Sequence, residues 1–114
     1  RIAKSRPVFL MRPIPEMGID VSKATARALM FGQTGRVSIP LSDYHLRNSF
    51  IWGAQDEARE RCGIKILDPL SYLCRDGRCH GVKEDRPLYV DDDHLSEYGN
   101  KLLIPMFAAV FQKK

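Results

Sequence analysis

One short segment places acidic residues and a histidine directly before an apolar stretch. Asp91-Asp92-Asp93-His94 is followed by Leu95 and Ser96, so Asp91 precedes His94 by three residues. Where the chain turns, a carboxylate at this spacing can reach back to the imidazole, fix its tautomer and stabilise the imidazolium formed during acyl transfer. The imidazole can then take a proton from a serine hydroxyl and return it to a leaving oxygen. The segment is therefore a candidate acid and base of a catalytic triad.

Other interpretations of these residue types stay open. An Asp-x-x-His spacing also occurs by chance in solvated acidic turns that carry an exposed histidine. Three consecutive aspartates resemble a site for a hard cation, although Ca²⁺ loops space their ligands at alternate positions and add a later Glu. A zinc site of Cys74, Cys79 and His80 is disfavoured, because adjacent ligands chelate poorly and no second ligand pair is obvious.

Size and charge set further bounds. The 114 residues are enough for one small domain, with 44% apolar and 28% charged residues, as in ordinary soluble proteins. The net charge of +4 comes from scattered basic residues such as Arg12 and Lys65, which favours a solvated surface over nucleic-acid binding. No apolar stretch approaches the roughly 20 residues of a membrane span. The polar start shows no signal peptide and no initiator Met, which suggests a processed chain with targeting information upstream.

The elements that position these residues can be read from apolar runs and caps. We expect a strand over residues 7–12, buried on both faces as in a parallel sheet, and a second strand over 64–68. A helix over 21–31 should begin at Asp20 and end at Gly32, and residues 33–41 should form a loop. Ser42 should cap a helix that runs to Cys62. Its predicted buried face is Leu46, Phe50, Ile51, Ala54 and Ala58, and that of the earlier helix is Val21, Ala24, Ala28, Leu29 and Phe31.

Strand, helix and strand in this order predict a βαβ unit. Residues 70–90 interrupt it with a small hairpin, in which Cys74 and Cys79 flank the turn sequence Arg-Asp-Gly-Arg. We expect the two cysteines to form a disulfide, which implies an oxidising compartment, and the alternative is two reduced thiols in a cytosolic hairpin. Cys62 is expected to be a buried thiol. Ser96 should cap a last helix that Pro105 kinks, with an apolar stripe of Leu102, Leu103, Met106, Phe107, Val110 and Phe111.

The segment Leu88–Asn100, LYVDDDHLSEYGN, resembles the last conserved block of SGNH-type hydrolases. It is most similar to extracytoplasmic SGNH-like domains fused behind membrane acyltransferases of the acyltransferase-3 type. Looser similarities cover about residues 7–107: Val8 to Met17 with its Arg-Pro-Ile-Pro-Glu, the helix ending at Cys62, Asp68-Pro69 with Tyr72-Leu73-Cys74, and Cys79. The resemblance implies an α/β fold, a three-layer α/β/α sandwich with a parallel, flavodoxin-like sheet. Residues 1–114 would be the C-terminal part of one such domain, with no internal boundary and a small disulfide-bearing hairpin.

The same resemblance implies an activity. Asp91 would be the triad acid and His94 the general base of a serine O-acyltransferase or esterase. This enzyme would transfer an acyl group, which we expect to be acetyl, to a hydroxyl of a cell-envelope polysaccharide. It would need no cofactor and no metal. The fused membrane domain would relay the acyl donor, and the site would face the periplasm at the inner membrane.

The nucleophile expected from this family is missing. No Gly-Asp-Ser occurs, and Ser38, Ser42 and Ser49 lack the strained strand-to-helix turn of a nucleophile. The oxyanion-hole Gly and Asn cannot be placed either, so we expect the isolated chain to be inactive.

Two alternatives belong to other classes. The first is a non-catalytic module that binds a glycan or docks on a membrane acyltransferase, which an exposed Trp52 or Tyr89 would favour. The second is a structural fragment. Two parallel strands leave most sheet neighbours missing, which predicts either that the rest of the sheet is encoded elsewhere or a homo-oligomer.

Overall fold

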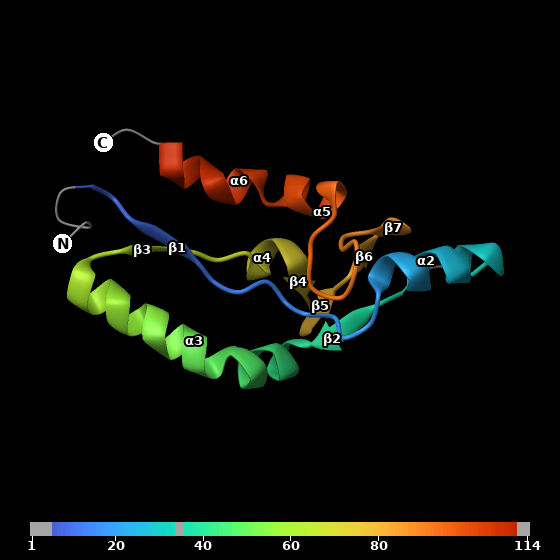
Figure 1. Ribbon diagram of the computed structural model, residues 1–114, viewed down its shortest axis with the longest axis horizontal. Coiled ribbons are helices and arrows are strands. Elements are labelled where there is room, and N and C mark those ends of the chain that lie inside the picture. The colour runs from blue at the N-terminus through green and yellow to red at the C-terminus, as the bar shows by residue number, and fades with distance from the viewer. Residues whose placement is uncertain (1–5, 34–35, 112–114) are drawn as a thin grey trace.

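The computed structural model describes residues 6–33 and 36–111, which form an elongated body of 55 × 30 × 22 Å (Figure 1). These residues form a mixed α/β fold with three small sheets. In chain order the elements are β1 (Phe9–Met11), α2 (Val21–Met30), β2 (Ser38–Pro40), α3 (Leu41–Cys62), β3 (Lys65–Leu67), α4 (Leu70–Leu73), β4 (Cys74–Arg75), β5 (Arg78–His80), β6 (Val82–Lys83), β7 (Arg86–Pro87), α5 (Glu97–Leu102), α6 (Ile104–Phe107) and the 3-10 helix η1 (Ala108–Phe111).

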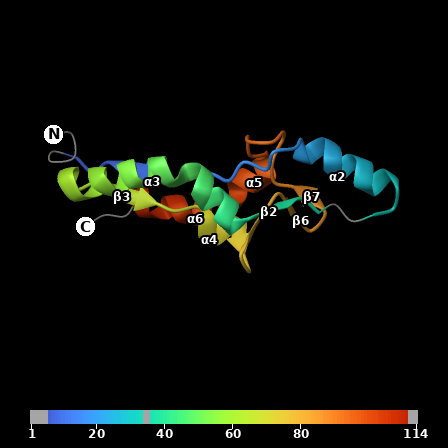
Figure 2. The same ribbon diagram turned by 90° about the horizontal axis from the view of Figure 1, so that it is seen from below.

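The predicted parallel strand pair is confirmed. β1 and β3 run parallel in register, with Leu10 opposite Ile66, and α3 precedes β3 in the connection between them. Figure 1 shows this pair between α3 and α6, and in Figure 2, seen from below, α3 overlaps β1. β1 is half-buried rather than buried on both faces, because it has a single strand partner among the described residues. The pair therefore forms part of a layered α/β arrangement, whereas a complete three-layer sandwich is not seen.

Helix α2 begins where its cap predicts. The Asp20 side chain accepts a hydrogen bond from the main-chain N–H of Lys23 at 2.9 Å. The helix ends one residue before the predicted end, at Met30. The predicted buried face is wrong in its second half, since Leu29 and Phe31 are exposed and the buried residues are Val21 and Thr25. The physical reason is that only the first turns pack on the body, while the far end of α2 projects from it (Figure 1).

Helix α3 packs through a face that the apolar pattern does not predict. Its buried residues are Tyr44 and Asn48, whereas Leu46 and Phe50 of the predicted face are more than four-fifths exposed. Ser42 is not its cap either, because the helix begins at Leu41, whose N–H donates to the carbonyl of Gly77 at 2.9 Å. At its other end the helix runs to Cys62 as predicted, and Gly63 ends it with a left-handed φ of 70°.

The buried face of α3 is held by polar contacts with the end of β1. The Tyr44 hydroxyl donates to the Pro13 carbonyl at 2.5 Å and accepts from Trp52 Nε1 at 3.0 Å. The Arg12 guanidinium lies 3.9 Å from the centre of the Trp52 ring and donates to Asp56 at 2.7 Å. Arg12 is thus buried, and its assignment to the solvated surface was wrong. The reason is that Gln55, Asp56 and the Trp52 carbonyl together supply acceptors for its buried charge.

A three-stranded antiparallel sheet carries the disulfide. β4 and β5 form a two-residue hairpin in which Asp76 and Gly77 both have positive φ, 56° and 78°, as a type I′ turn requires. Cys74 and Cys79 face each other across this hairpin and are joined by a disulfide. The predicted loop 33–41 is wrong in part, because β2 adds to β5 as a third strand; residues 34 and 35 lie outside the described range. Cys62, predicted to be buried, is an exposed free thiol on the last turn of α3.

The C-terminal third turns twice before its final helices. β6 and β7 pair through residues 82–83 and 86–87, which adds a second hairpin within residues 70–90. Ser96 caps α5 as predicted, and Pro105 lies where α5 gives way to α6. Within the predicted apolar stripe only Leu103 and Met106 are buried, and Phe111 is exposed. None of the helices in residues 6–33 and 36–111 is long and apolar enough to cross a bilayer.

Candidate active site

The candidate residues lie on a short loop that closes on itself. Tyr89 and Leu95 form an isolated antiparallel bridge, and the Val90 N–H donates to the His94 carbonyl at 2.8 Å. Only four residues lie between Val90 and Leu95, so the chain must make a tight turn. Asp91 and His94 lie at the two ends of this turn, with their side chains within reach of each other. The turn that the Asp-x-x-His spacing requires is therefore present.

Main-chain hydrogen bonds attach this loop to the segment that follows β1. The N–H of Met17 donates to the Asp92 carbonyl at 2.8 Å, and the N–H of Val21 donates to the Asp91 carbonyl at 3.2 Å. Residues 12–20 leave the carboxyl end of β1, so the candidate site lies beyond the carboxyl end of the parallel pair. Ligands bind at this end of the strands in open α/β sheets.

Tyr89, directly before the loop, connects it to the segment that follows β1 and to α2. It is fully buried, its hydroxyl donates to the Pro15 carbonyl at 2.5 Å, and its own carbonyl accepts from Ser22 Oγ at 2.8 Å. Burial raises the pKa of this phenol well above its usual value, so it remains a neutral hydrogen-bond donor. No sequence pattern indicates this role, because a tyrosine in an apolar run indicates burial but not its partner.

The start of α5 fixes the other end of the loop. Ser96 Oγ accepts from the Gly99 N–H at 3.0 Å and donates to the Pro87 carbonyl at 2.8 Å. Gly99 lies against the Leu88 carbonyl so closely that a Cβ at this position would overlap with it. Glycine is therefore required here by close approach of the helix to the main chain before the loop.

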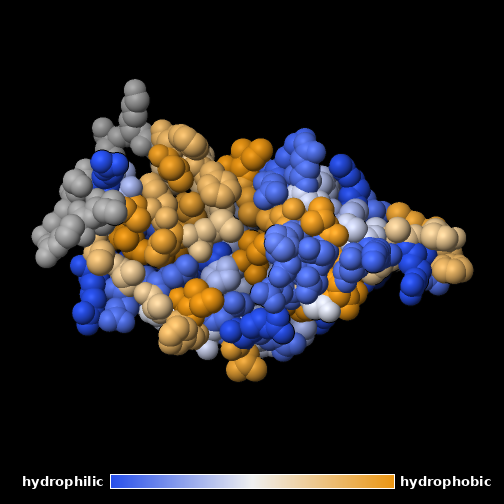
Figure 3. Space-filling model, in the orientation of Figure 1, coloured by the Kyte–Doolittle hydropathy of each residue, from blue (hydrophilic) through white to orange (hydrophobic). Residues whose placement is uncertain are grey.

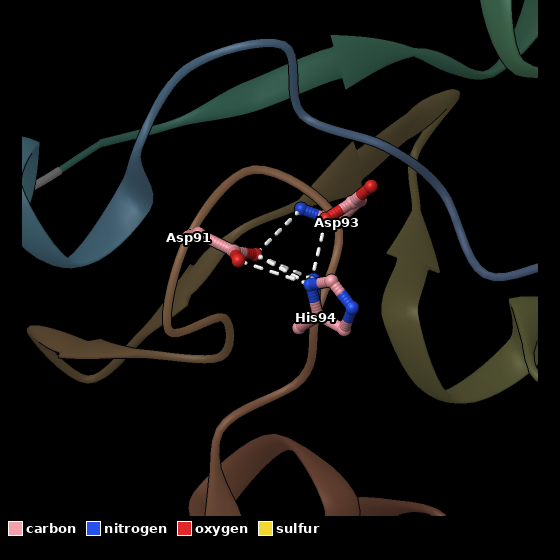
Figure 4. A group of neighbouring side chains, drawn as sticks. All are labelled: Asp91, Asp93 and His94. Atoms are coloured by element: carbon pink, nitrogen blue, oxygen red, sulfur yellow. Dashed lines mark hydrogen bonds and ion pairs between the residues drawn. The ribbon is translucent and has the colours of Figure 1, made fainter.

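Asp91 organises both the main chain and the ring of His94 (Figure 4). Its Oδ1 accepts the N–H of His94 at 2.7 Å and the N–H of Asp93 at 3.0 Å. His94 Nδ1 lies 3.0 Å from Asp91 Oδ2 and 2.8 Å from Asp93 Oδ1. The other ring nitrogen, Nε2, points away from both carboxylates (Figure 4). The ring thus presents one nitrogen to the acids and the other to the exterior.

The electrostatics follow from these contacts. Hydrogen bonds from the main-chain N–H groups of Asp93 and His94 lower the pKa of Asp91 to about 2, with a smaller contribution from the His94 ring. The hydrogen bond to Asp91, followed by the charges of Asp91 and Asp93, raises the pKa of His94 above its ordinary value. Desolvation and the neighbouring charge of Asp92 raise the pKa of Asp93. Asp91 is therefore the carboxylate that stays ionised most firmly.

This arrangement can perform general acid–base chemistry. When Nδ1 donates to Asp91, the neutral ring has its lone pair on Nε2, where it can accept a proton from an incoming hydroxyl. The side chain of His94 is 74% exposed, so a substrate can reach it. The same three residues, Asp91, Asp93 and His94, have ligand atoms within 4.8 Å of one another, a spacing that also suits a cation. Binding a cation there would take Nδ1 away from Asp91.

The described serines do not contact His94. Ser22 and Ser96 donate to main-chain carbonyls, and Ser38 accepts from Arg78 Nε at 2.7 Å. Ser42 and Ser49 are exposed on α3. No serine in residues 6–33 or 36–111 forms a hydrogen bond with His94, so the structure brings the acid and base together without a nucleophile.

Comparison with known proteins identifies a family. The model of the family described as "SGNH domain (fused to AT3 domains)" matches residues 1–109, nearly the whole chain. Neither the curated proteins nor the solved structures contain a match to the sequence.

Proposed function

Because this chain belongs to the family of SGNH domains fused to AT3 domains, we propose that it supplies the acid and base of an acyl-transfer site. Membership of this family indicates an acyltransferase or esterase function. The finer proposal is that Asp91 is the acid, His94 is the base, and the acceptor is a hydroxyl of a cell-envelope polysaccharide. The observation that carries it is the 3.0 Å contact from Asp91 Oδ2 to His94 Nδ1, with Nε2 facing outward.

The reaction would proceed in two steps. In the first, His94 Nε2 takes the proton of a serine hydroxyl while the serine oxygen attacks the acyl carbonyl, and the imidazolium then protonates the departing oxygen or sulfur of the donor. In the second, His94 takes the proton of a sugar hydroxyl, the sugar oxygen attacks the acyl-serine, and the proton returns to the serine oxygen. Asp91 stays ionised throughout, because its pKa is about 2, and stabilises the imidazolium in both steps.

The nucleophile would come from a segment outside these 114 residues. Two features of the described chain support the presence of such a segment. Within residues 6–33 and 36–111, β1 and β3 pair only with each other, so each leaves an open edge. On α3 the side chains of Leu46, Phe50 and Ile51 are exposed, and Figure 3 shows further apolar residues gathered over the side that carries β1 and α6. A second copy of the chain is the other candidate to cover these edges.

The cellular setting is part of the proposal. Fusion to AT3 domains indicates a membrane-protein context, in which the membrane domain would relay the acyl group, acetyl in our proposal. The disulfide between Cys74 and Cys79 supports an oxidising compartment and hence the periplasmic face of the membrane.

The test begins with the proton affinity of His94. In an NMR titration of the whole chain, the pKa of His94 should lie above 6.5 and should fall in Asp91→Asn, because that variant loses the largest cause of the raised value. Asp93→Asn is the matched control, since it removes an equal charge whose effect on the ring is smaller. An ordinary His94 pKa that Asp91→Asn leaves unchanged would contradict the assignment of an acid–base pair.

Activity provides the second test. In the protein that carries both domains, His94→Ala and Asp91→Asn should each abolish or strongly reduce acyl transfer, and neither should prevent folding of this exposed loop. In Asp91→Asn the acidic limb of the pH–rate profile should move to lower pH, since His94 must lose its proton to act as a base. Full activity of His94→Ala would refute the proposal.

The alternative of a glycan-binding module loses the two aromatic residues that were expected to favour it. Tyr89 is fully buried. Trp52 is half-buried with Arg12 stacked on its ring and its Nε1 bonded to Tyr44. Neither residue can form an exposed aromatic platform.

A further inference from the structure

A pocket of about 610 Å³ lies between α4, the disulfide hairpin, β6 and α5. None of Asp91, Asp93 and His94 lines it, so it is distinct from the candidate active site. We propose that this pocket binds an anionic saccharide, meaning a sugar that carries a carboxylate or a phosphate. This inference rests on the pocket alone and does not depend on the proposed acyl transfer.

The charge of the pocket favours an anion. Arg75 and Lys83 both line it and both are exposed. None of the ion pairs among the described residues involves either of them, so each cation is free to bind a ligand. The one acidic residue in the lining is Glu84, which leaves a positive balance in the pocket. Guanidinium and ammonium groups bind carboxylates and phosphates by charge-assisted hydrogen bonds.

The remaining wall suits a polyhydroxylated ring. Tyr72 lines the pocket with about 38% of its surface exposed, and apolar contacts come from Leu73, Val82 and Leu88. An aromatic face and aliphatic side chains can pack on the C–H face of a sugar, while Ser71 and Glu84 can bond its hydroxyls. The volume is in the range that encloses a drug-sized ligand and therefore a short oligosaccharide.

The hairpins hold the main chain that carries the two cations before the ligand arrives. The disulfide and the pairing of Arg75 with Arg78 hold β4 against β5, so the main chain that carries Arg75 cannot drift from His80 on the facing strand. β6 is held in turn by β7, which sets Lys83 opposite Arg86. A rigid wall lowers the entropy lost on binding, which is the condition for affinity at an open site.

Calorimetry and an NMR titration of the whole chain test the proposal with three probes: digalacturonate, glucose 6-phosphate and the neutral disaccharide maltose. At least one acidic probe should bind and shift the signals of residues 71–75 and 82–84, while maltose should bind at least about tenfold more weakly. Binding of digalacturonate alone would identify a carboxylate as the recognised group, and binding of glucose 6-phosphate alone would identify a phosphate.

The variant Arg75→Gln/Lys83→Gln should lower the affinity for the acidic probe at least about tenfold. The double variant Arg59→Gln/Arg61→Gln on α3 removes the same charge away from the pocket and should leave the affinity unchanged. Arg75→Lys keeps the charge and should retain most of the binding, which separates loss of charge from loss of fold. The proposal is overturned if maltose binds as well as the acids, if no probe binds, or if both double variants behave alike.

Discussion

Removal of one hydroxyl tests how the candidate site is held. Tyr89→Phe deletes the hydrogen bond from the buried phenol to the Pro15 carbonyl and keeps the ring in place. This bond joins the segment after β1 to the loop that carries Asp91 and His94. Because Tyr89 is fully buried, no water can replace the lost donor without a rearrangement of the core.

The expected loss of stability in Tyr89→Phe follows from the burial of this hydroxyl. A carbonyl left without its partner in the interior costs about 1–3 kcal/mol, more than the net value of an ordinary hydrogen bond. For a domain of roughly this length, each kcal/mol lowers the Tm by about 4–8 °C. We therefore expect Tyr89→Phe to lower the Tm by several degrees and to reduce the urea midpoint without a change in the slope of the transition.

The control is Tyr98→Phe, which makes the same chemical change at the surface. The Tyr98 hydroxyl donates to Glu84 across 3.5 Å in an exposed position, so its loss should alter the free energy of unfolding by less than about 0.5 kcal/mol. Urea unfolding followed by fluorescence or circular dichroism measures both variants. If Tyr89→Phe is no less stable than Tyr98→Phe, the loop does not depend on this bond and the reasoning fails.

Three further changes test other parts of the framework. Gly99→Ala should lower the stability by about 1–3 kcal/mol in urea unfolding, because its Cβ overlaps with a main-chain carbonyl, whereas Gly53→Ala in open space on α3 should raise it by about 0.5–1 kcal/mol. Replacing Cys74 and Cys79 together by Ala should lower the stability by about 2 kcal/mol. In thermal unfolding, dithiothreitol should lower the Tm of the wild type and leave that of the double variant unchanged. Because the pKa of Asp91 falls from 3.8 to about 2 on folding, its stabilising effect is complete above about pH 4 and should be lost between pH 4 and 2, so the urea midpoint of Asp91→Asn should fall less over this range than that of the wild type.

Local chemistry explains the elements that the sequence predicted correctly. Asp20 and Ser96 cap their helices because a short side-chain acceptor satisfies an N–H three residues later, which needs no tertiary information. The Asp76-Gly77 turn closes a hairpin because both residues tolerate positive φ. Pro105 interrupts the last helix because it lacks an N–H. The Asp91–His94 contact belongs to the same class, since a four-residue loop sets it.

Partners distant in sequence explain the elements that it did not predict. β2 is three residues long and ends in Pro40, so nothing within it identifies a strand, and it exists because β5 offers an edge. Arg12 is buried only because α3 brings three acceptors and the Trp52 ring to it. No pattern along the chain could have shown which face of α3 would meet these groups.

Helix α3 has two faces of different chemistry. The helix has side chains able to be buried on two faces: one with Tyr44 and Trp52, which packs on the end of β1, and one with Leu46, Phe50 and Ile51, which is exposed. The apolar periodicity predicted burial of the second face. The first face is buried through polar contacts, which a hydropathy pattern does not detect. A helix with both kinds of face is suited to a position between two layers, with β1 on one side and further structure on the other. The open edges of the parallel pair favour the same addition. A further strand that runs parallel to β1 or β3 would end on the side of the sheet where Asp91 and His94 lie.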